Sequence, residues 1–262
     1  MPLNIPGILV PLHLLVNPRL VLPAIIIKDI RQLDFRELYR AGYRGAVFDK
    51  DNCLTIPYKD QLVPELHDAW KECREVFGDG NVLIVSNSAG TRLDPGGIQA
   101  ESVSHYLSVP VLQHSSLKPS YSCIGAIRKY FASLPTPVKD EELIVVGDRI
   151  FTDVVLANRM SRWRRLPHST DVVDEKEDDA RNSRRGPLAI WTTGVWEKES
   201  MAMRYLENLT MQGIHKLVHR GAAGQRPSED HYTRFVKPLP PPDVSGTERG
   251  WISKVFASLR RT

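Results

Sequence analysis

Short apolar runs alternate along the middle of the chain with longer segments in which apolar residues recur every three or four positions. The runs are nearly continuous in apolar residues, which is typical of strands buried on both faces of a parallel sheet. They lie at residues 45–48, 81–86, 109–112, 142–147 and 188–192. The periodic segments predict helices at about 64–77, 97–107, 119–134, 152–161 and 197–219. This alternation predicts an α/β fold, a three-layer Rossmann-like parallel sheet flanked by helices.

The pattern changes at the N-terminus. Residues 1–18 contain no charged side chain, but they include Pro2, Pro6, Pro11 and Pro18. Each interior proline disrupts a helix that lipid would require to be fully hydrogen-bonded, so a membrane-spanning helix is disfavoured. We expect residues 1–40 to form an apolar segment that either lies at a membrane surface or packs on the domain.

Two later segments also depart from the α/β pattern. Residues 164–187 are polar and dense in charge, so we predict a disordered surface insertion within a domain that spans residues 41–220. Residues 221–262 predict a basic linker followed by a short amphipathic C-terminal helix. Apolar residues recur on one face of that helix: Trp251, Ile252, Val255, Phe256 and Leu259. A membrane anchor and a terminal helix docked on the domain both fit this pattern.

Charge and cysteine content exclude several classes of protein. The 262 residues carry 35 Lys and Arg against 31 Asp and Glu, a net charge of +4 that is too mild to indicate a nucleic-acid-binding protein. The three cysteines, Cys53, Cys73 and Cys123, form no C-x-x-C pair, so neither a disulfide framework nor a zinc site is expected. A reducing compartment fits this cysteine content.

Polar residues follow the predicted strands. Asp49 and Asp51 come after the first run, Ser86 ends the second, and Asp148 and Asp153 come after the fourth. Because the carboxyl ends of parallel strands meet at one edge of a sheet, where ligands bind, we expect these side chains to lie close together. Taken singly, each residue has a structural alternative, since aspartate and serine are common in turns and at helix starts.

The residue types at this edge favour a metal ion and an anion. Two neighbouring carboxylates repel each other unless a cation neutralises them. No cysteine or histidine cluster lies nearby in the sequence, and an all-oxygen site suits Mg²⁺. Lys118 precedes a helix that Pro119 opens, so its ammonium can lie beside the positive end of that helix and attract an anion.

Together these residues resemble the four motifs of the haloacid dehalogenase (HAD) superfamily of aspartate-nucleophile phosphatases. The motifs read "DKDNCLT", "SNS", "KP" and "GDRIFTD". The resemblance implies a HAD-type fold and an aspartyl-phosphate intermediate, with Asp49 as the nucleophile and Asp51 as the general acid and base. It also implies that Ser86 and Lys118 stabilise the transferring oxygens.

The same resemblance implies bound Mg²⁺ and an open site. The implied metal-site residues are Asp49, Asp51, Asp148 and Asp153, of which Asp51 contributes its backbone carbonyl and Asp153 orients a metal-bound water or Lys118. The intervals 51–86 and 86–118 leave room for little more than one helix–strand crossover each, which predicts a minimal cap domain or none. In this superfamily an open site goes with bulky substrates.

A narrower resemblance is carried by "FDKDNCLT", "SNSAG", "VLQHSSLKP" and "VVGDRIFTD", which are similar to the fungal mitochondrial phosphatidylglycerophosphate phosphatases. It implies hydrolysis of phosphatidylglycerophosphate to phosphatidylglycerol in cardiolipin biosynthesis, by a peripheral protein on the matrix face of the mitochondrial inner membrane. The partners would then be a phospholipid substrate and an anionic membrane, with a homo-oligomer left open and no nucleic acid. Asn87, Arg92 and Arg149 adjoin the second and fourth motifs and are candidate substrate-binding residues.

Two alternatives remain open. The same chemistry would serve a phosphatase that acts on a soluble metabolite or a phosphoprotein, without a membrane role. A non-enzymatic scaffold could retain the fold, although the complete set of catalytic positions gives that alternative little support. Cys53 is expected to be a packing residue rather than a nucleophile, and His114 is either structural, which we favour, or part of the pocket.

Overall fold

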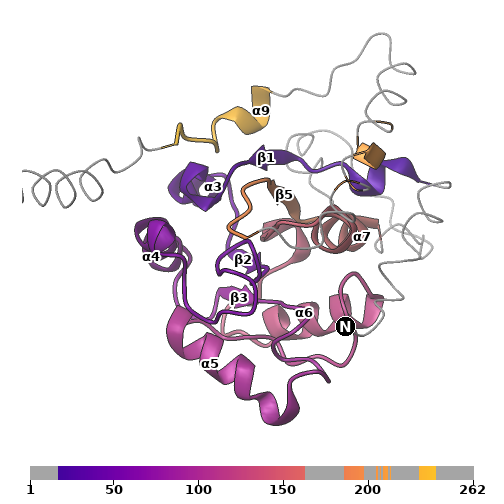
Figure 1. Ribbon diagram of the computed structural model, residues 1–262. Coiled ribbons are helices and arrows are strands. Elements are labelled where there is room, and N and C mark those ends of the chain that lie inside the picture. Colours follow the sequence, from indigo (N-terminus) through magenta and orange to yellow (C-terminus); the bar gives the residue numbers. More distant parts are fainter. Residues whose placement is uncertain are drawn as a thin grey trace, which may run out of the picture.

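A five-stranded parallel sheet forms the centre of the computed structural model, which describes residues 17–162, 186–197, 205, 207, 209–211, 213 and 230–239 (Figure 1). Its strand order is β1-β5-β4-β2-β3. The strands are β1 (Ile25–Ile27), β2 (Gly45–Phe48), β3 (Val82–Ile84), β4 (Leu143–Gly147) and β5 (Leu188–Thr192). Every pair of neighbours in this sheet is parallel, so the predicted α/β fold is confirmed.

Helices cover both faces of the sheet. They are α3 (Phe35–Arg40), α4 (His67–Phe77), α5 (Ile98–Leu107), α6 (Tyr121–Ala132), α7 (Val155–Arg162) and α9 (Asp230–Thr233). Short 3-10 turns precede helices or strands: η1 (Pro18–Val21) and η5 (Asp140–Glu142) precede strands, and η2 (Ile30–Gln32), η3 (Pro64–Leu66) and η4 (Pro95–Gly97) precede helices. One π-helical turn, η6 (Ile150–Val154), links β4 to α7. Within the predicted helix 197–219, residue 197 is a bend, whereas the described residues 205, 207, 209–211 and 213 are helical.

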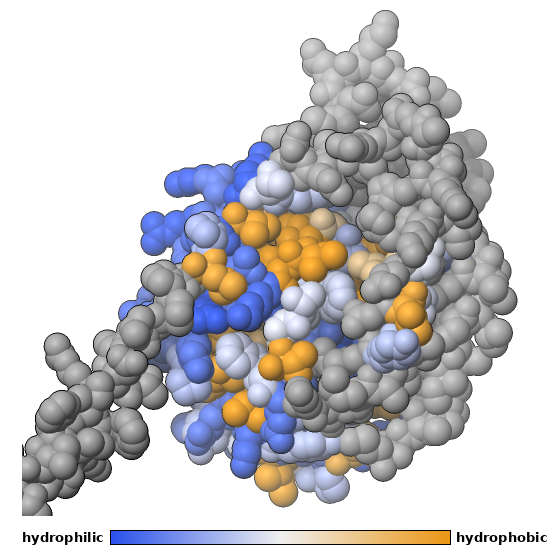
Figure 2. Space-filling model, turned by 45° about the horizontal axis from the view of Figure 1, so that its top comes forward, coloured by the Kyte–Doolittle hydropathy of each residue, from blue (hydrophilic) through white to orange (hydrophobic). Residues whose placement is uncertain are grey.

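Side-chain alternation in the strands divides the core into two layers. Ala46 and Phe48 of β2 pack in one cluster with α3, α4 and α5, whereas Val47 packs in a second cluster with α6 and α7. All four residues of β2 are buried, as expected for a central strand covered on both faces. Outside these layers, Figure 2 shows apolar side chains in separate surface patches between hydrophilic ones.

Two strand predictions differ from the structure. Residues 109–112 form only an isolated bridge, between Ile84 and Val111, and not a strand. Pro110 has no N–H to donate to a ladder, which explains why the pairing stays short. The edge strand β1 was not predicted, because its three isoleucines continue an apolar segment that has no period of its own.

Residues 17–40 belong to the α/β domain, so the packing alternative applies to this part of the predicted segment 1–40. Strand β1 pairs with β5, and Asn158 Nδ2 of α7 donates hydrogen bonds to the carbonyls of Leu20 and Leu22 at 2.8 and 3.0 Å. Residues 1–16, and with them most of the uncharged segment, lie outside the described residues.

The predicted C-terminal linker contains a segment that docks on the domain. Phe235 is completely buried, its ring meets Tyr43 edge-on at 6.1 Å, and Val236 bridges to Leu33. The linker prediction is therefore wrong for residues 230–239, because Phe235 gives this polar stretch an apolar anchor. Residues 164–185 of the predicted insertion 164–187, and the predicted C-terminal helix within 251–262, lie outside the described residues.

The remaining question for the fold is whether any part of it could cross a bilayer. Among the described residues, no helix has both the length and the apolar character needed to span a membrane.

Candidate active site

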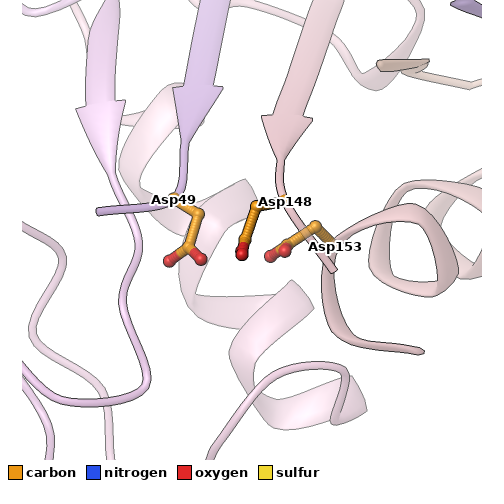
Figure 3. A group of neighbouring side chains, drawn as sticks. All are labelled: Asp49, Asp148 and Asp153. Atoms are coloured by element: carbon orange, nitrogen blue, oxygen red, sulfur yellow. The ribbon is translucent and has the colours of Figure 1, made fainter. Parts of the chain in front are cut away.

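Three aspartates point into one space at the carboxyl edge of the sheet (Figure 3). Asp49 follows β2, Asp148 follows the adjacent strand β4, and Asp153 lies in η6. One carboxylate oxygen from each lies within 4.8 Å of the other two. The predicted convergence of these side chains is therefore seen in the structure, because β2 and β4 pair directly and end at the same level.

A glycine makes this convergence possible. A Cβ atom built on Gly147 would lie 2.3 Å from Cγ of Asp153, so only glycine lets η6 turn back against the end of β4. Asp153 Oδ2 then accepts hydrogen bonds from the backbone N–H of Arg149 at 3.2 Å and from Thr152 Oγ1 at 3.1 Å. These bonds fix the carboxylate, so Asp153 has a defined orientation toward Asp49 and Asp148.

Lys118 places a buried positive charge among the carboxylates. Its Nζ donates to Asp49 Oδ1 and to Asp153 Oδ1, both at 2.7 Å, and its side chain is 3% exposed. Burial alone would lower the pKa of this ammonium, but the attraction of Asp153 and Asp49 outweighs burial and raises the pKa above its ordinary value. Lys118 therefore stays charged, as a site for an anionic group requires.

Asn87 holds the backbone of Lys118. Its Oδ1 accepts from the Lys118 N–H at 2.6 Å, and its Nδ2 donates to the Lys118 carbonyl at 3.4 Å. On the other side, Arg159 Nη1 donates to the carbonyl of Pro119 at 2.6 Å. The structure thus gives Asn87, a candidate substrate-binding residue, a contact that positions Lys118.

Asp51 lies outside the group of three aspartates and contacts a different set of donors. Its Oδ1 forms an ion pair with Lys50 Nζ at 2.7 Å and accepts a hydrogen bond from the Tyr58 N–H at 3.2 Å. Its Oδ2 accepts from Ser88 Oγ at 3.1 Å, and Ser88 Oγ lies 2.9 Å from Ser86 Oγ. A chain of hydroxyl groups therefore connects Asp51 to the predicted phosphate-contacting Ser86.

Sequence reasoning gave no role to Lys50, Ser88 and Glu207. Lys50 and Ser88 stand inside quoted motifs, so the motif spacing itself was the available signal for both. Glu207 is buried and its Oε1 accepts from the Phe151 N–H at 3.2 Å, in η6. No local pattern indicates that contact, because 56 positions separate the two residues.

Two predicted arginines lie at the margin of the site. Arg92 is exposed on the loop that follows β3, and Arg149 is half-buried directly after Asp148. The backbone N–H of Arg149 donates to Asp153 Oδ2 at 3.2 Å. The contact of both arginines with substrate stays a prediction.

Cys53 and His114 are buried side chains beside the site. Burial raises the pKa of the Cys53 thiol well above its usual value, with Asp49 adding to the shift, so this thiol stays protonated and does not act as a nucleophile. His114 lies between two backbone carbonyls, with Nδ1 2.7 Å from Ser116 O and Nε2 3.0 Å from Ser86 O. These contacts fit the structural role that was favoured for His114.

The three aspartates could hold a metal ion. The ligand atoms are all carboxylate oxygens, the type that Mg²⁺ prefers, and their spacing of at most 4.8 Å suits one shared ion. Because Lys118 neutralises only part of their charge, a cation would also relieve repulsion between the carboxylates. The side chain of Asp51 is not in this group, and the contribution of its backbone carbonyl stays a prediction.

Comparison with known proteins identifies relatives with a shared name. The family model described as "Mitochondrial PGP phosphatase" matches residues 5–169. The mitochondrial phosphatidylglycerophosphatase of Saccharomyces cerevisiae is 35% identical over 161 residues, which cover 62% of this chain and 85% of the relative. A probable mitochondrial phosphatidylglycerophosphatase of Schizosaccharomyces pombe is 30% identical over 191 residues, 68% of this chain and 90% of the relative.

A chloroplast relative differs in length. The phosphatidylglycerophosphate phosphatase 1 of Chlamydomonas reinhardtii is 41% identical over 144 residues, so the match covers 55% of this chain and about half, 51%, of that relative. No solved structure matches this chain. Because the family model covers more than half of the chain and includes all four motifs, the chain belongs to the mitochondrial PGP phosphatase family.

Proposed function

We propose that the protein is a Mg²⁺-dependent phosphomonoesterase that converts phosphatidylglycerophosphate to phosphatidylglycerol in cardiolipin biosynthesis, through an aspartyl-phosphate intermediate. The observation that carries the proposal is the buried Lys118 ammonium held 2.7 Å from both Asp49 and Asp153. An anion-attracting group beside a carboxylate at a sheet edge is what attack on a phosphate ester needs. The names of the relatives support the choice of ester.

In the proposed mechanism, Asp49 and Asp51 divide the reaction into two steps. A carboxylate oxygen of Asp49 attacks phosphorus while the bond to the leaving glycerol oxygen breaks, and Asp51 gives that oxygen a proton. In the second step a water molecule transfers a proton to Asp51, attacks phosphorus and displaces Asp49. Phosphate then leaves, and both aspartates return to their starting state.

Other residues at the edge support the charge that moves in these steps. Lys118 lies within hydrogen-bond distance of Asp49, so a phosphate on Asp49 would lie within reach of its ammonium. Ser86 would donate its hydroxyl to a transferring oxygen. Asp49, Asp148 and the Asp51 backbone carbonyl would hold Mg²⁺, which supplies a positive charge that offsets the repulsion between the nucleophile and the phosphate.

We also propose that the protein works as a peripheral protein at an anionic membrane, the matrix face of the mitochondrial inner membrane. Several large apolar side chains are exposed on loops and first helical turns that follow the carboxyl ends of the strands: Tyr58, Leu93, Ile98, Tyr121 and Val195. Apolar and aromatic side chains at such an edge would enter the headgroup region while the site meets a lipid phosphate. Arg92 on the same edge would attract anionic headgroups and the second phosphate of the substrate.

Phosphate release from phosphatidylglycerophosphate in mixed micelles tests the function, with a panel of soluble phosphomonoesters in parallel. We expect Mg²⁺-dependent release with a preference for the lipid. Asp49→Asn should lower kcat on the order of 10³-fold or more, as loss of a nucleophile does in other enzymes. Better turnover of a soluble ester would keep the phosphatase and discard the lipid substrate. An Asp49→Asn variant as active as the native protein would remove the nucleophile assignment.

A further inference from the structure

Lys50 is a charged residue in a place where a lysine is costly. It stands between Asp49 and Asp51, and its side chain is 0% exposed. Its Nζ lies 2.7 Å from Asp51 Oδ1, 2.9 Å from the carbonyl oxygen of Lys59 and 3.8 Å from Asp60 Oδ1. A buried ammonium is tolerated only when it is paired in this way, and an apolar side chain of similar size often serves stability equally well. Stability alone therefore does not explain why a charged residue occupies this position.

The two carboxylate oxygens of Asp51 have different surroundings. Oδ1 forms an ion pair with the buried Lys50 Nζ and accepts a hydrogen bond from the backbone N–H of Tyr58, and both partners belong to the loop that follows β2. Oδ2 accepts from the hydroxyl of Ser88, which lies next to the hydroxyl of Ser86. Oδ1 is thus paired with a completely buried ammonium, whereas the partner of Oδ2 is a hydroxyl that can rotate.

We infer that Lys50 is a positioning residue that fixes Asp51 through Oδ1 and so makes Oδ2 the oxygen that exchanges the proton. This inference rests on the proposed function of Asp51 as the general acid and base. In the first step the proton on Oδ2 passes to the leaving alcohol oxygen as its bond to phosphorus breaks and the Asp49–phosphorus bond forms. In the second step the attacking water returns a proton to Oδ2 as the Asp49–phosphorus bond breaks.

A positioning role predicts a particular pattern among substrates. An alkyl phosphate has a poor leaving group that depends on a proton from Asp51, whereas the p-nitrophenolate of p-nitrophenyl phosphate leaves without one. Loss of Lys50 would let Asp51 turn, so it should slow the alkyl ester much more than the aryl ester. A role in stability alone would lower both rates by the same factor, because it changes only the amount of active enzyme.

The experiment measures kcat/KM of the full chain for glycerol phosphate and for p-nitrophenyl phosphate, since this constant reports the step that breaks the ester bond. Lys50→Met should lower the alkyl-to-aryl ratio on the order of tenfold or more, given that general acids contribute about 10²- to 10⁴-fold. Lys59→Met is the matched control, because it removes a lysine charge from the same loop while its exposed side chain contacts none of the groups around Asp51 that the structure describes. Its ratio should equal that of the native protein.

The ratio is independent of the fraction of folded enzyme, so a destabilised variant still gives a valid result. An unchanged ratio in Lys50→Met, or a folded variant inactive on both esters, would overturn the inference. Should Lys50→Met not fold at all, Lys50→Gln, which keeps one donor, is measured in the same way and decides the question. Failure of the proposed function is a separate outcome, since it would appear as full activity in Asp49→Asn.

Discussion

The two edges of the sheet place their charged residues in opposite ways. At the carboxyl edge, Lys118 and Asp153 are almost completely buried and face each other across the ends of the strands. At the amino edge, charged residues pair nearer the surface, as Arg128 of α6 does with Asp140 before β4 at 2.6 Å. Burying charge costs stability unless the partners are well placed. This difference is what we expect if the proposed chemistry takes place at the carboxyl edge while the amino edge serves stability.

Among the substitutions that test the difference between the two edges, Gly147→Ala should have the largest effect. The added Cβ would push Asp153 away from Lys118, so we expect phosphate release to fall on the order of 10²-fold, as misplaced catalytic groups do. The free energy of unfolding should also fall by about 1 to 3 kcal/mol because of the overpacking. Phosphate release and thermal unfolding are the two measurements.

Gly125→Ala is the matched control for that substitution. A Cβ atom at Gly125, inside α6, would meet no atom within 4 Å. Alanine is the better helix former by about 1 kcal/mol, so this variant should be fully active and slightly more stable. Equal activity in the two glycine variants would contradict the account of Gly147.

Exposed apolar residues at the two edges give a second test of the difference between them. A combined variant Leu93→Ser, Ile98→Ser and Val195→Ser at the carboxyl edge should weaken sedimentation with vesicles of phosphatidylcholine and phosphatidylglycerol by about tenfold, through lost apolar contact. Its turnover of p-nitrophenyl phosphate should be unchanged. Tyr39 and Tyr106 are exposed at the ends of α3 and α5, at the amino edge, and their replacement by serine is the control. Equal binding by both variants would exclude the carboxyl edge as the membrane contact.

A smaller effect is expected for the loop that carries Arg92, through Asp94. Burial would raise the pKa of Asp94, but backbone N–H donors from Gly90, Gln99 and Ala100 outweigh burial and lower it below the ordinary value. A lowered folded-state pKa means that the stabilisation is present above the unfolded pKa of about 3.9 and is lost as pH falls through the folded value. Asp94→Asn should therefore cost about 1 kcal/mol at neutral pH. The difference from the native protein should vanish in acid unfolding curves at the lowest pH.

The smallest effect should come from the amino edge. Arg128→Ala removes two hydrogen bonds to Asp140 and one to the Met160 carbonyl, in a partly exposed ion pair. We expect a loss of about 0.5 kcal/mol in unfolding free energy, because solvent screens such pairs. Phosphate release per folded molecule should be unchanged. A loss of activity there would show that the two edges are coupled, and the comparison would then fail.

Much of the site could be predicted because its residues stand at strand ends. The positions of Asp49, Asp148 and Asp153 follow from the rule that parallel strands end at one edge, and the structure places them together. The family assignment from the motifs is confirmed by the family model. The contacts of Asn87 with Lys118 could not be foreseen, because they depend on how two loops pack and not on local sequence.

Other parts of the fold escaped prediction for physical reasons. Strand β1 is hidden within a longer apolar segment, and residues 109–112 look like a strand although Pro110 limits their pairing. The burial of Lys50 could not be predicted from the sequence, because lysine side chains are almost never fully buried. A single apolar residue in a polar stretch, Phe235, gives too weak a signal to predict docking.

The docking of Phe235 affects how the domain can be made and cut. Its ring packs against Tyr43, and the next residue, Val236, bridges to Leu33, so these contacts can form only after residue 236 has left the ribosome. Until then the nascent protein would expose the apolar surface around Tyr43 to chaperones and proteases. For the same reason, a shortened protein that ends at residue 220 would lose core packing along with its tail. A cut after residue 239 would keep Phe235 and its packing against Tyr43.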